Sequence, residues 1–154
     1  MKGRTSLNIL DAQKRILPSI FEGTMIQTSL EPSLQMTVHR CTGAVAISEI
    51  TEVIRKFYES APTLHVLWDF SHADVSAIKS GEIEALASIV ARNLHSREGG
   101  KNVIISPNDV SFGLSRVYQS FAEMRSQMTE TRVFRSEAEA REWLVSSATR
   151  GESS

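Results

Sequence analysis

The chain has 154 residues, of which 41% are hydrophobic, and its formal net charge at pH 7 is -1. This length fits one domain, and the apolar fraction is enough to bury a core. The near-zero charge gives no general attraction to nucleic acid or to acidic membranes, so we expect neither as a partner.

The single cysteine, Cys41, has no intramolecular disulfide partner, and the four histidines show no metal-ligand spacing with it. We therefore predict no metal and no cofactor. The first 25 residues contain Asp11, Lys14, Arg15 and Pro18, which interrupt any apolar signal-peptide core, and no run approaches the roughly 20 apolar residues of a membrane span. These features favour a cytoplasmic protein.

The first predicted elements are two strands, at residues 25–30 and 35–41, separated by turn-forming residues around Pro32. In the second strand Met36 and Val38 alternate with Thr37 and His39, which indicates one apolar and one polar face. We expect an antiparallel hairpin at the start of the sheet.

Helices and strands then alternate to the end of the chain. The pattern predicts a helix capped by Ser48, a buried strand at 64–70, and a helix from Ser80 to Gly99 with Arg92 and Arg97 toward its end. It then predicts a strand at 103–106 and a helix from Asp109 to Arg125. The last elements are a strand at 131–135 and a helix that begins with a capping box at Ser136–Glu139. The fold class is therefore α/β: a mixed, mostly parallel four- to five-stranded sheet with an N-terminal hairpin and about four helices.

Three segments follow from these patterns. Residues 25–146 form the predicted domain, and the small polar residues 147–154 are predicted to be a flexible tail. Residues 1–24 are an N-terminal extension, for which two alternatives remain open: an arm that packs on a neighbouring subunit, or a mobile leader to the domain.

Several sequence runs carry a family resemblance. They are LHVLWDFS at 64–71, NDVSFGLSRVY at 108–118, RVFRS at 132–136 and AREWL at 140–144. With the order of elements over roughly residues 25–144, they resemble the SpoIIAA-like branch of the STAS superfamily. The resemblance implies a mixed sheet with helices and a non-enzymatic module that regulates by docking another protein.

The resemblance also implies a phosphorylation site and an alternative function. Related proteins are switched by phosphorylation of a Ser or Thr at a helix N-terminus in an Asp-Ser-Ser-Gly-like motif. The matching turn at 77–81 keeps Ser80 and Gly81 but lacks the acidic residue and the preceding serine, so Ser80 matches that motif only in part. The fold group further resembles lipid-carrying domains, which implies a carrier of a small apolar ligand or lipid between helices and sheet.

Polar residues gather where the predicted strands end. In an open α/β sheet these ends meet in one crevice, where helix N-termini present free N–H groups to anions. The candidates for such a crevice are Asp69, Ser71, His72, Asp74, Ser80, Ser106, Asn108 and Asp109. Ordinary helix caps are the simpler interpretation of the same residues. A second alternative is a serine hydrolase that uses Ser71 or Ser106 with His72, although no Gly-x-Ser-x-Gly elbow is present.

Other side chains bear on packing and docking. Asp69 lies in an apolar strand, so we expect it to pair with a backbone donor or with Arg116. Phe112, Arg116 and Tyr118 lie partly off the apolar stripe of their helix and are the candidates for docking a partner, which is another protein or a second copy of the chain. Trp68 and Trp143 are expected in the core.

The sequence thus favours a STAS-like regulatory or interaction module without catalytic residues. A closed core with an exposed apolar patch would support docking. A lined internal cavity on the order of several hundred Å³ would support the ligand carrier instead.

Overall fold

The computed structural model describes residues 25–153, with side chains for residues 25–146. The predicted extension at 1–24 lies outside these residues. The backbone of the predicted tail lies in the last turns of the C-terminal helix up to Ser153, and its side chains are outside the described part.

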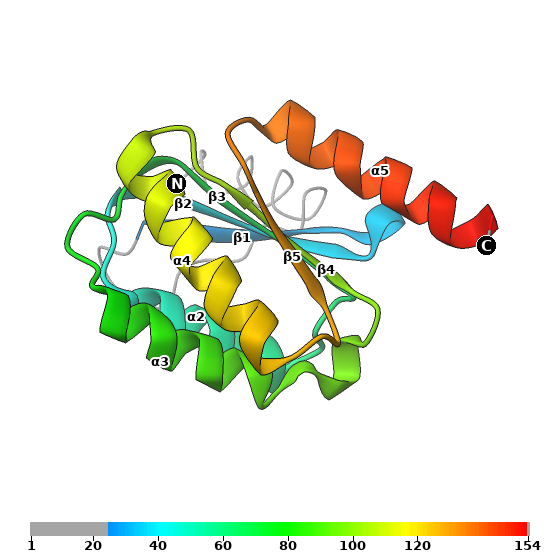
Figure 1. The fold of residues 1–154 in the computed structure, drawn as a ribbon, viewed down its shortest axis with the longest axis horizontal. Coiled ribbons are helices and arrows are strands. Elements are labelled where there is room, and N and C mark those ends of the chain that lie inside the picture. Colours follow the sequence, from blue (N-terminus) through cyan, green and yellow to red (C-terminus); the bar gives the residue numbers. More distant parts are fainter. Residues whose placement is uncertain (1–24, 154) are drawn as a thin grey trace, which may run out of the picture.

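The centre of the fold is one five-stranded sheet (Figure 1). Its strands lie side by side in chain order: β1 (Ile26–Glu31), β2 (Met36–Ala44), β3 (His65–Asp74), β4 (Lys101–Ile105) and β5 (Glu130–Phe134). β1 and β2 pair antiparallel, and the remaining pairs are parallel. The predicted mixed, mostly parallel sheet with an N-terminal hairpin is confirmed.

Four helices cover the sheet, as predicted. They are α2 (Ile47–Glu59), α3 (Ser80–Ala91), α4 (Asp109–Arg125) and α5 (Glu137–Ser153), and two short 3-10 turns lie at Pro32–Leu34 and Leu94–Arg97. Figure 1 shows α2, α3 and α4 on one side of the sheet and α5 on the other. The result is three layers, with unequal helix cover on the two faces.

Two helix starts test the predicted caps. α2 begins after Ala46, and Glu49 accepts the N–H of that residue at 2.8 Å, so Ser48 lies inside the first turn and its predicted capping role is wrong. A carboxylate at the third helical position satisfies the same backbone group. The cap of α5 is confirmed, because Ser136 Oγ accepts the Glu139 N–H at 3.2 Å.

β3 is longer than predicted. It continues to Asp74 because β2 continues to Ala44, and after a register shift near Cys41 the two strands pair from Thr42–His72 to Ala44–Asp74. Ser71, His72 and Asp74 therefore belong to a strand and not to a loop after it, which corrects their predicted place.

Both faces of β2 and β3 are buried. On the α2–α4 side the core includes Ile54, Trp68 and Ile104, and on the α5 side it includes Val38 and Trp143. Trp68 and Trp143 are buried as expected. The polar face predicted for β2 is wrong: Thr37 and His39 are 3% and 2% exposed, because helices pack against both sides of this strand.

The segment after α3 also differs from the prediction. The predicted helix from Ser80 to Gly99 is shorter, since α3 ends at Ala91. Arg97 lies in the 3-10 turn that follows and is 1% exposed. Gly100 permits a close approach of the chain here, since a Cβ there would lie 2.1 Å from the Leu64 carbonyl oxygen.

A chain of ion pairs joins α5 to the sheet. The distances are 2.6 Å for Asp69–Arg40, 3.0 Å for Arg40–Glu137, 2.7 Å for Glu137–Arg141 and 2.6 Å for Arg141–Glu31. Hydrogen bonds from Arg40 and Arg141 lower the pKa of Glu137 to about 2. The network connects β1, β2 and β3 with the first turns of α5.

Asp69 is the most buried member of this network, at 7% exposure. It accepts the Ser71 N–H at 2.9 Å, so the expected backbone donor is confirmed. The expected partner Arg116 is wrong, because Arg116 lies on α4, on the opposite side of the sheet, and Arg40 on the neighbouring strand takes its place.

We predict that Arg40→Met lowers the free energy of unfolding by about 1–3 kcal/mol, because Asp69 then stays buried without a cationic partner. Urea unfolding followed by circular dichroism measures the change. Arg55→Met is the matched control: Arg55 pairs with Glu52 and Glu59 on exposed α2 surface, where ion pairs contribute little to stability. Equal losses in the two variants would contradict the role given to the network.

Candidate functional site: an apolar pocket between the sheet and three helices

Alternation along the strands directs one set of side chains toward α2, α3 and α4. In β2, β3 and β4 this set includes His39, Trp68 and Ile104, while their neighbours face α5. The three helices that follow these strands return over the same face, as parallel connections require. The space between them is where the candidate site lies.

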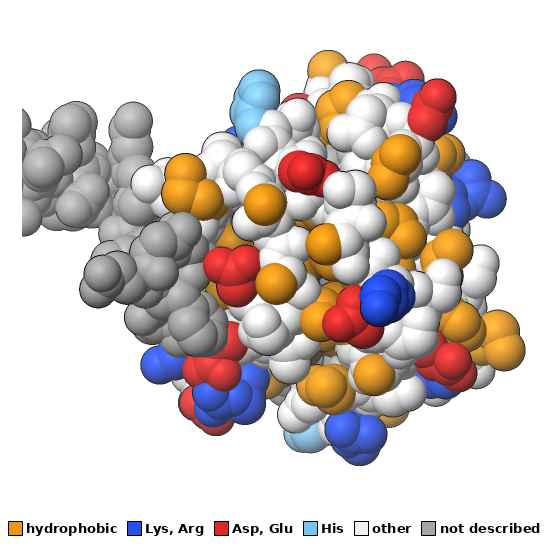
Figure 2. All heavy atoms as spheres, turned by 90° about the vertical axis from the view of Figure 1, so that its left-hand side faces the viewer, with side chains coloured by type: hydrophobic (Ala, Val, Ile, Leu, Met, Phe, Trp, Pro, Cys, Tyr) orange, Lys and Arg blue, Asp and Glu red, His pale blue; other side chains and the backbone are white. Residues whose placement is uncertain are grey.

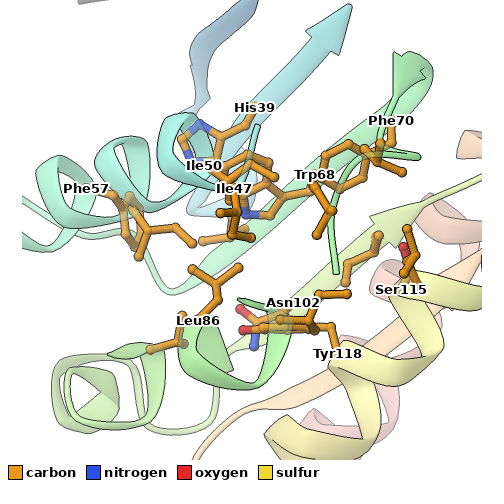
Figure 3. Close-up of a pocket in the computed structure, with 18 of the residues that line it drawn as sticks. His39, Ile47, Ile50, Phe57, Trp68, Phe70, Leu86, Asn102, Ser115 and Tyr118 are labelled. Atoms are coloured by element: carbon orange, nitrogen blue, oxygen red, sulfur yellow. The ribbon is translucent and has the colours of Figure 1, made fainter. Parts of the chain in front are cut away.

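An apolar pocket occupies this space, with a volume of about 100 Å³. Figure 3 shows His39 and Trp68 lining it from the sheet, Leu86 from α3, and Ser115 and Tyr118 from α4. Ile, Leu, Val and aromatic side chains supply most of its walls. Protein interiors are close-packed and hold few voids larger than a water molecule, so a gap of this size in a core is unusual.

The volume limits what the pocket can hold. An engineered apolar cavity of about 150 Å³ takes up benzene. At about 100 Å³, this pocket has room for a compact molecule near the size of a single ring or a short aliphatic chain. It is smaller than the several hundred Å³ that we expected of a carrier, so a large lipid does not fit without expansion.

His39 is a neutral group in the pocket wall. Its ring packs against Trp68 with centroids 4.3 Å apart and the planes tilted by 37°, and its Nδ1 shares a hydrogen bond of 2.8 Å with Thr28 Oγ1. Burial, with the nearby charge of Arg97, lowers the pKa of His39 to about 3. The imidazole is therefore uncharged at neutral pH.

Arg97 places a buried cation at the other end of the pocket. Its guanidinium donates hydrogen bonds to Tyr58 Oη at 2.9 Å, to Asn102 Oδ1 at 2.7 Å and to the backbone oxygens of Thr63 and Leu64, both at 3.0 Å. Each guanidinium nitrogen thus has a partner from the protein. The side chain stabilises the pocket end and has little hydrogen-bonding capacity left for a ligand.

Three serines lie where α4 begins. Ser106 and Ser115 are buried and bond to each other through their hydroxyls at 2.8 Å. Ser111 is 1% exposed, and its Oγ has no hydrogen-bond partner in the described part of the chain. Ser111 and Ser115 both line the pocket, so this group supplies polar atoms to an otherwise apolar wall.

The predicted crevice residues do not form one site. Asp69 belongs to the ion network, Ser106 is buried against Ser115, and Asn108 caps α4 by accepting the Ser111 N–H at 2.8 Å. Asp109 is exposed and pairs with Arg135 at 3.0 Å. The helix-cap interpretation therefore accounts for Asn108.

The other crevice candidates lie near the same edge of the sheet. His72, Asp74 and Ser80 are exposed, and Asp74 accepts hydrogen bonds from Ser76. In Figure 2, which views this side of the molecule, hydrophobic side chains lie between uncharged groups, and acidic and basic side chains are interspersed. A single-sign field that would attract an anion is not formed on this face.

The hydrolase alternative gains no support from the geometry. Within the described residues neither Ser71 nor Ser106 forms a hydrogen bond with His72. A serine nucleophile requires a base within hydrogen-bond reach.

The three docking candidates separate into two environments. Tyr118 turns inward to line the pocket, and its burial raises the pKa of the phenol, so its predicted place on a docking surface is wrong. Phe112 is half-buried, with the guanidinium of Arg135 4.2 Å and that of Arg116 5.9 Å from its ring centroid. Phe112 and Arg116 therefore remain on an outer surface of α4.

Sequence reasoning missed several pocket residues. The alternation in β2 predicts a polar strand face for His39, and the pattern places Arg97 toward the end of a helix, yet both side chains are buried. Ser115 carries no sequence signal, because a lone helical serine resembles any solvated position. Only the apolar run around Trp68 signalled that β3 is covered on both faces.

Among the described residues, no group of three or more His, Cys, Asp or Glu side chains is placed to hold a metal. No helix in the described part has the length and apolar content needed to cross a membrane. Comparison with protein-family models and with curated proteins gives no match for this chain.

We predict that acid lowers the stability of the fold because His39 is buried in its neutral form. Its folded pKa of about 3 lies below the unfolded value of 6.5, so only the unfolded state takes up the proton between these values. The contribution of His39 to the free energy of unfolding is fully present above pH 6.5. It is lost as the pH decreases, by about 2 kcal/mol between pH 7.5 and 5.0. Urea unfolding at the two pH values measures the loss, and the part that comes from His39 should be absent in His39→Asn.

The exposed His72 provides the control, since His72→Asn should keep the full pH dependence. His65 has a pKa lowered by partial burial and by Lys101, and it contributes equally in all three proteins. An unchanged loss in His39→Asn would show that the imidazole of His39 is not kept neutral by burial.

Proposed function

We propose that this chain is a non-enzymatic binding module that holds a compact, mostly apolar molecule in the pocket between the sheet and α2, α3 and α4. The observation that carries this proposal is the cavity of about 100 Å³, whose walls are apolar side chains from α2, α3, α4, β3 and β4. Ligand pockets are typically concave, mostly apolar and furnished with a few placed polar groups. Here those groups are contributed by His39, Arg97, Asn102, Ser111, Ser115 and the two tyrosines.

Three further predictions accompany this proposal. The order of strands and helices supports kinship with the SpoIIAA-like branch of the STAS superfamily, and that kinship remains a prediction from the sequence runs. A reducing cytoplasm is the compartment that the single, buried Cys41 favours. Phosphorylation of Ser80, the exposed first residue of α3, likewise remains a prediction.

The two tryptophans provide a sharp test of ligand binding. Trp68 lines the pocket, whereas Trp143 packs on the opposite side of the sheet. We expect toluene to shift the indole N–H resonance of Trp68 in a ¹H–¹⁵N spectrum, to leave that of Trp143 in place, and to raise the Tm. At 100 times its Kd a ligand stabilises the folded state by about 2.7 kcal/mol.

Leu86→Phe should abolish these effects, because the larger side chain fills the pocket from α3. Leu34→Phe makes the same enlargement on an exposed residue and should bind toluene as the unmodified protein does. Equal shifts of both indole resonances, or a response that survives Leu86→Phe, would count against the pocket.

A second candidate function is docking of a second copy of the chain through the start of α4. Val110 is 58% exposed, and next to it Phe112 is held between the guanidinium groups of Arg116 and Arg135. Aromatic and Arg side chains of this kind are enriched at the centres of protein interfaces. The ring is already ordered, so docking would cost little side-chain entropy.

Sedimentation equilibrium tests this second proposal. We expect the unmodified protein to dimerise and Phe112→Asp to remain monomeric, because a buried carboxylate at the interface centre is unfavourable. Met124→Asp, at an exposed position near the other end of α4, is the control and should dimerise normally. A monomer at every concentration would refute self-association.

A further inference from the structure

One residue of the pocket wall has a buried polar atom without a partner among the described residues. Ser111 lines the pocket and is 1% exposed, and its Oγ has no hydrogen-bond partner among the described residues. Buried hydroxyls in folded proteins nearly always have one, so each exception calls for an explanation such as a bound molecule. An unsatisfied hydroxyl in an apolar wall is a ready contact for a ligand.

The groups that a hydroxyl at this position usually bonds have other partners here. A helical serine often donates to the carbonyl one turn earlier, which here belongs to Pro107. That oxygen already accepts a hydrogen bond from Arg135 at 2.9 Å. The serine one turn later, Ser115, is engaged with Ser106 at 2.8 Å. Ser111 Oγ thus forms no hydrogen bond with either of these neighbours.

The charges around the pocket restrict the ligand further. Arg97 is the one permanently charged side chain in the pocket wall, and its guanidinium nitrogens are bonded to protein oxygens. His39 is neutral because burial lowers its pKa. An ionised ligand group would lose its hydration in this apolar site, and Arg97, although cationic, has little hydrogen-bonding capacity left to replace the lost water, which makes binding of an ion unfavourable.

We propose that Ser111 Oγ is the polar anchor of the pocket, and that the ligand is a neutral, compact apolar molecule carrying one hydroxyl or carbonyl oxygen. This inference rests on the proposed ligand-binding function and adds the chemistry of the ligand to it. The walls would enclose the apolar body, while the single oxygen would exchange a hydrogen bond with Ser111.

Three ligands of similar size test the inference: toluene, phenol and benzoate. Their Kd values come from titrations that follow the Trp68 indole resonance at pH 7.5, in the unmodified protein and in Ser111→Ala. We expect phenol to bind about tenfold more weakly to Ser111→Ala, as the loss of one net hydrogen bond implies. Toluene should bind both proteins alike, and benzoate should bind the unmodified protein at least about tenfold more weakly than phenol.

Two controls test whether weaker binding by Ser111→Ala comes from a folding defect. Ser111→Ala removes an unsatisfied hydroxyl, so its Tm without ligand should be equal to or higher than that of the unmodified protein. Ser120→Ala changes an exposed serine of the same helix and should leave all three affinities unchanged.

The outcomes separate this inference from the function on which it rests. If neither toluene nor phenol moves the Trp68 resonance of the unmodified protein, the proposed binding function fails. If both bind and Ser111→Ala weakens neither, the pocket stands and Ser111 is not its anchor. Tighter binding of benzoate than of phenol would overturn the neutral ligand.

Discussion

The buried guanidinium of Arg97 is the interaction on which the pocket depends. It connects α2 through Tyr58, the start of β3 through the Thr63 and Leu64 carbonyls, and β4 through Asn102. A planar group with five fixed donors can join several elements at once, which a lysine cannot do. Arg97 thereby holds α2, β3 and β4 together. The apolar side chains of the pocket wall do not fill the space between these elements.

The two faces of the sheet are packed differently. On the α5 side, Met36, Val38, Leu67 and Trp143 form a packed cluster, and the ion network from Asp69 to Glu31 fixes the helix to three strands. On the other side, three helices cover the sheet but leave a cavity. A fold that holds one face rigidly can keep a void on the other, because the strands themselves are already fixed in place.

The chemistry of the pocket follows from how its polar groups are satisfied. Arg97 is bonded to protein oxygens, His39 is kept neutral by burial, and Ser106 and Ser115 bond to each other. The Ser111 hydroxyl is the buried polar atom of the wall that has no partner among the described residues. Selectivity in such a site comes from the cost of leaving a buried polar atom unpaired.

The sequence by itself determined the alternation of strands and helices, the bounds of α4, the hairpin and the Ser136 cap, because these depend on local periodicity and on capping chemistry. It did not determine which polar side chains are buried. His39, Arg97 and Ser111 have ordinary neighbours in sequence, and their environment arises from segments far apart in the chain: the second layer over β2, the turn after α3 and the helices that enclose the pocket. Only the tertiary structure decided these, since burial is a property of packing between elements and not of the period within one.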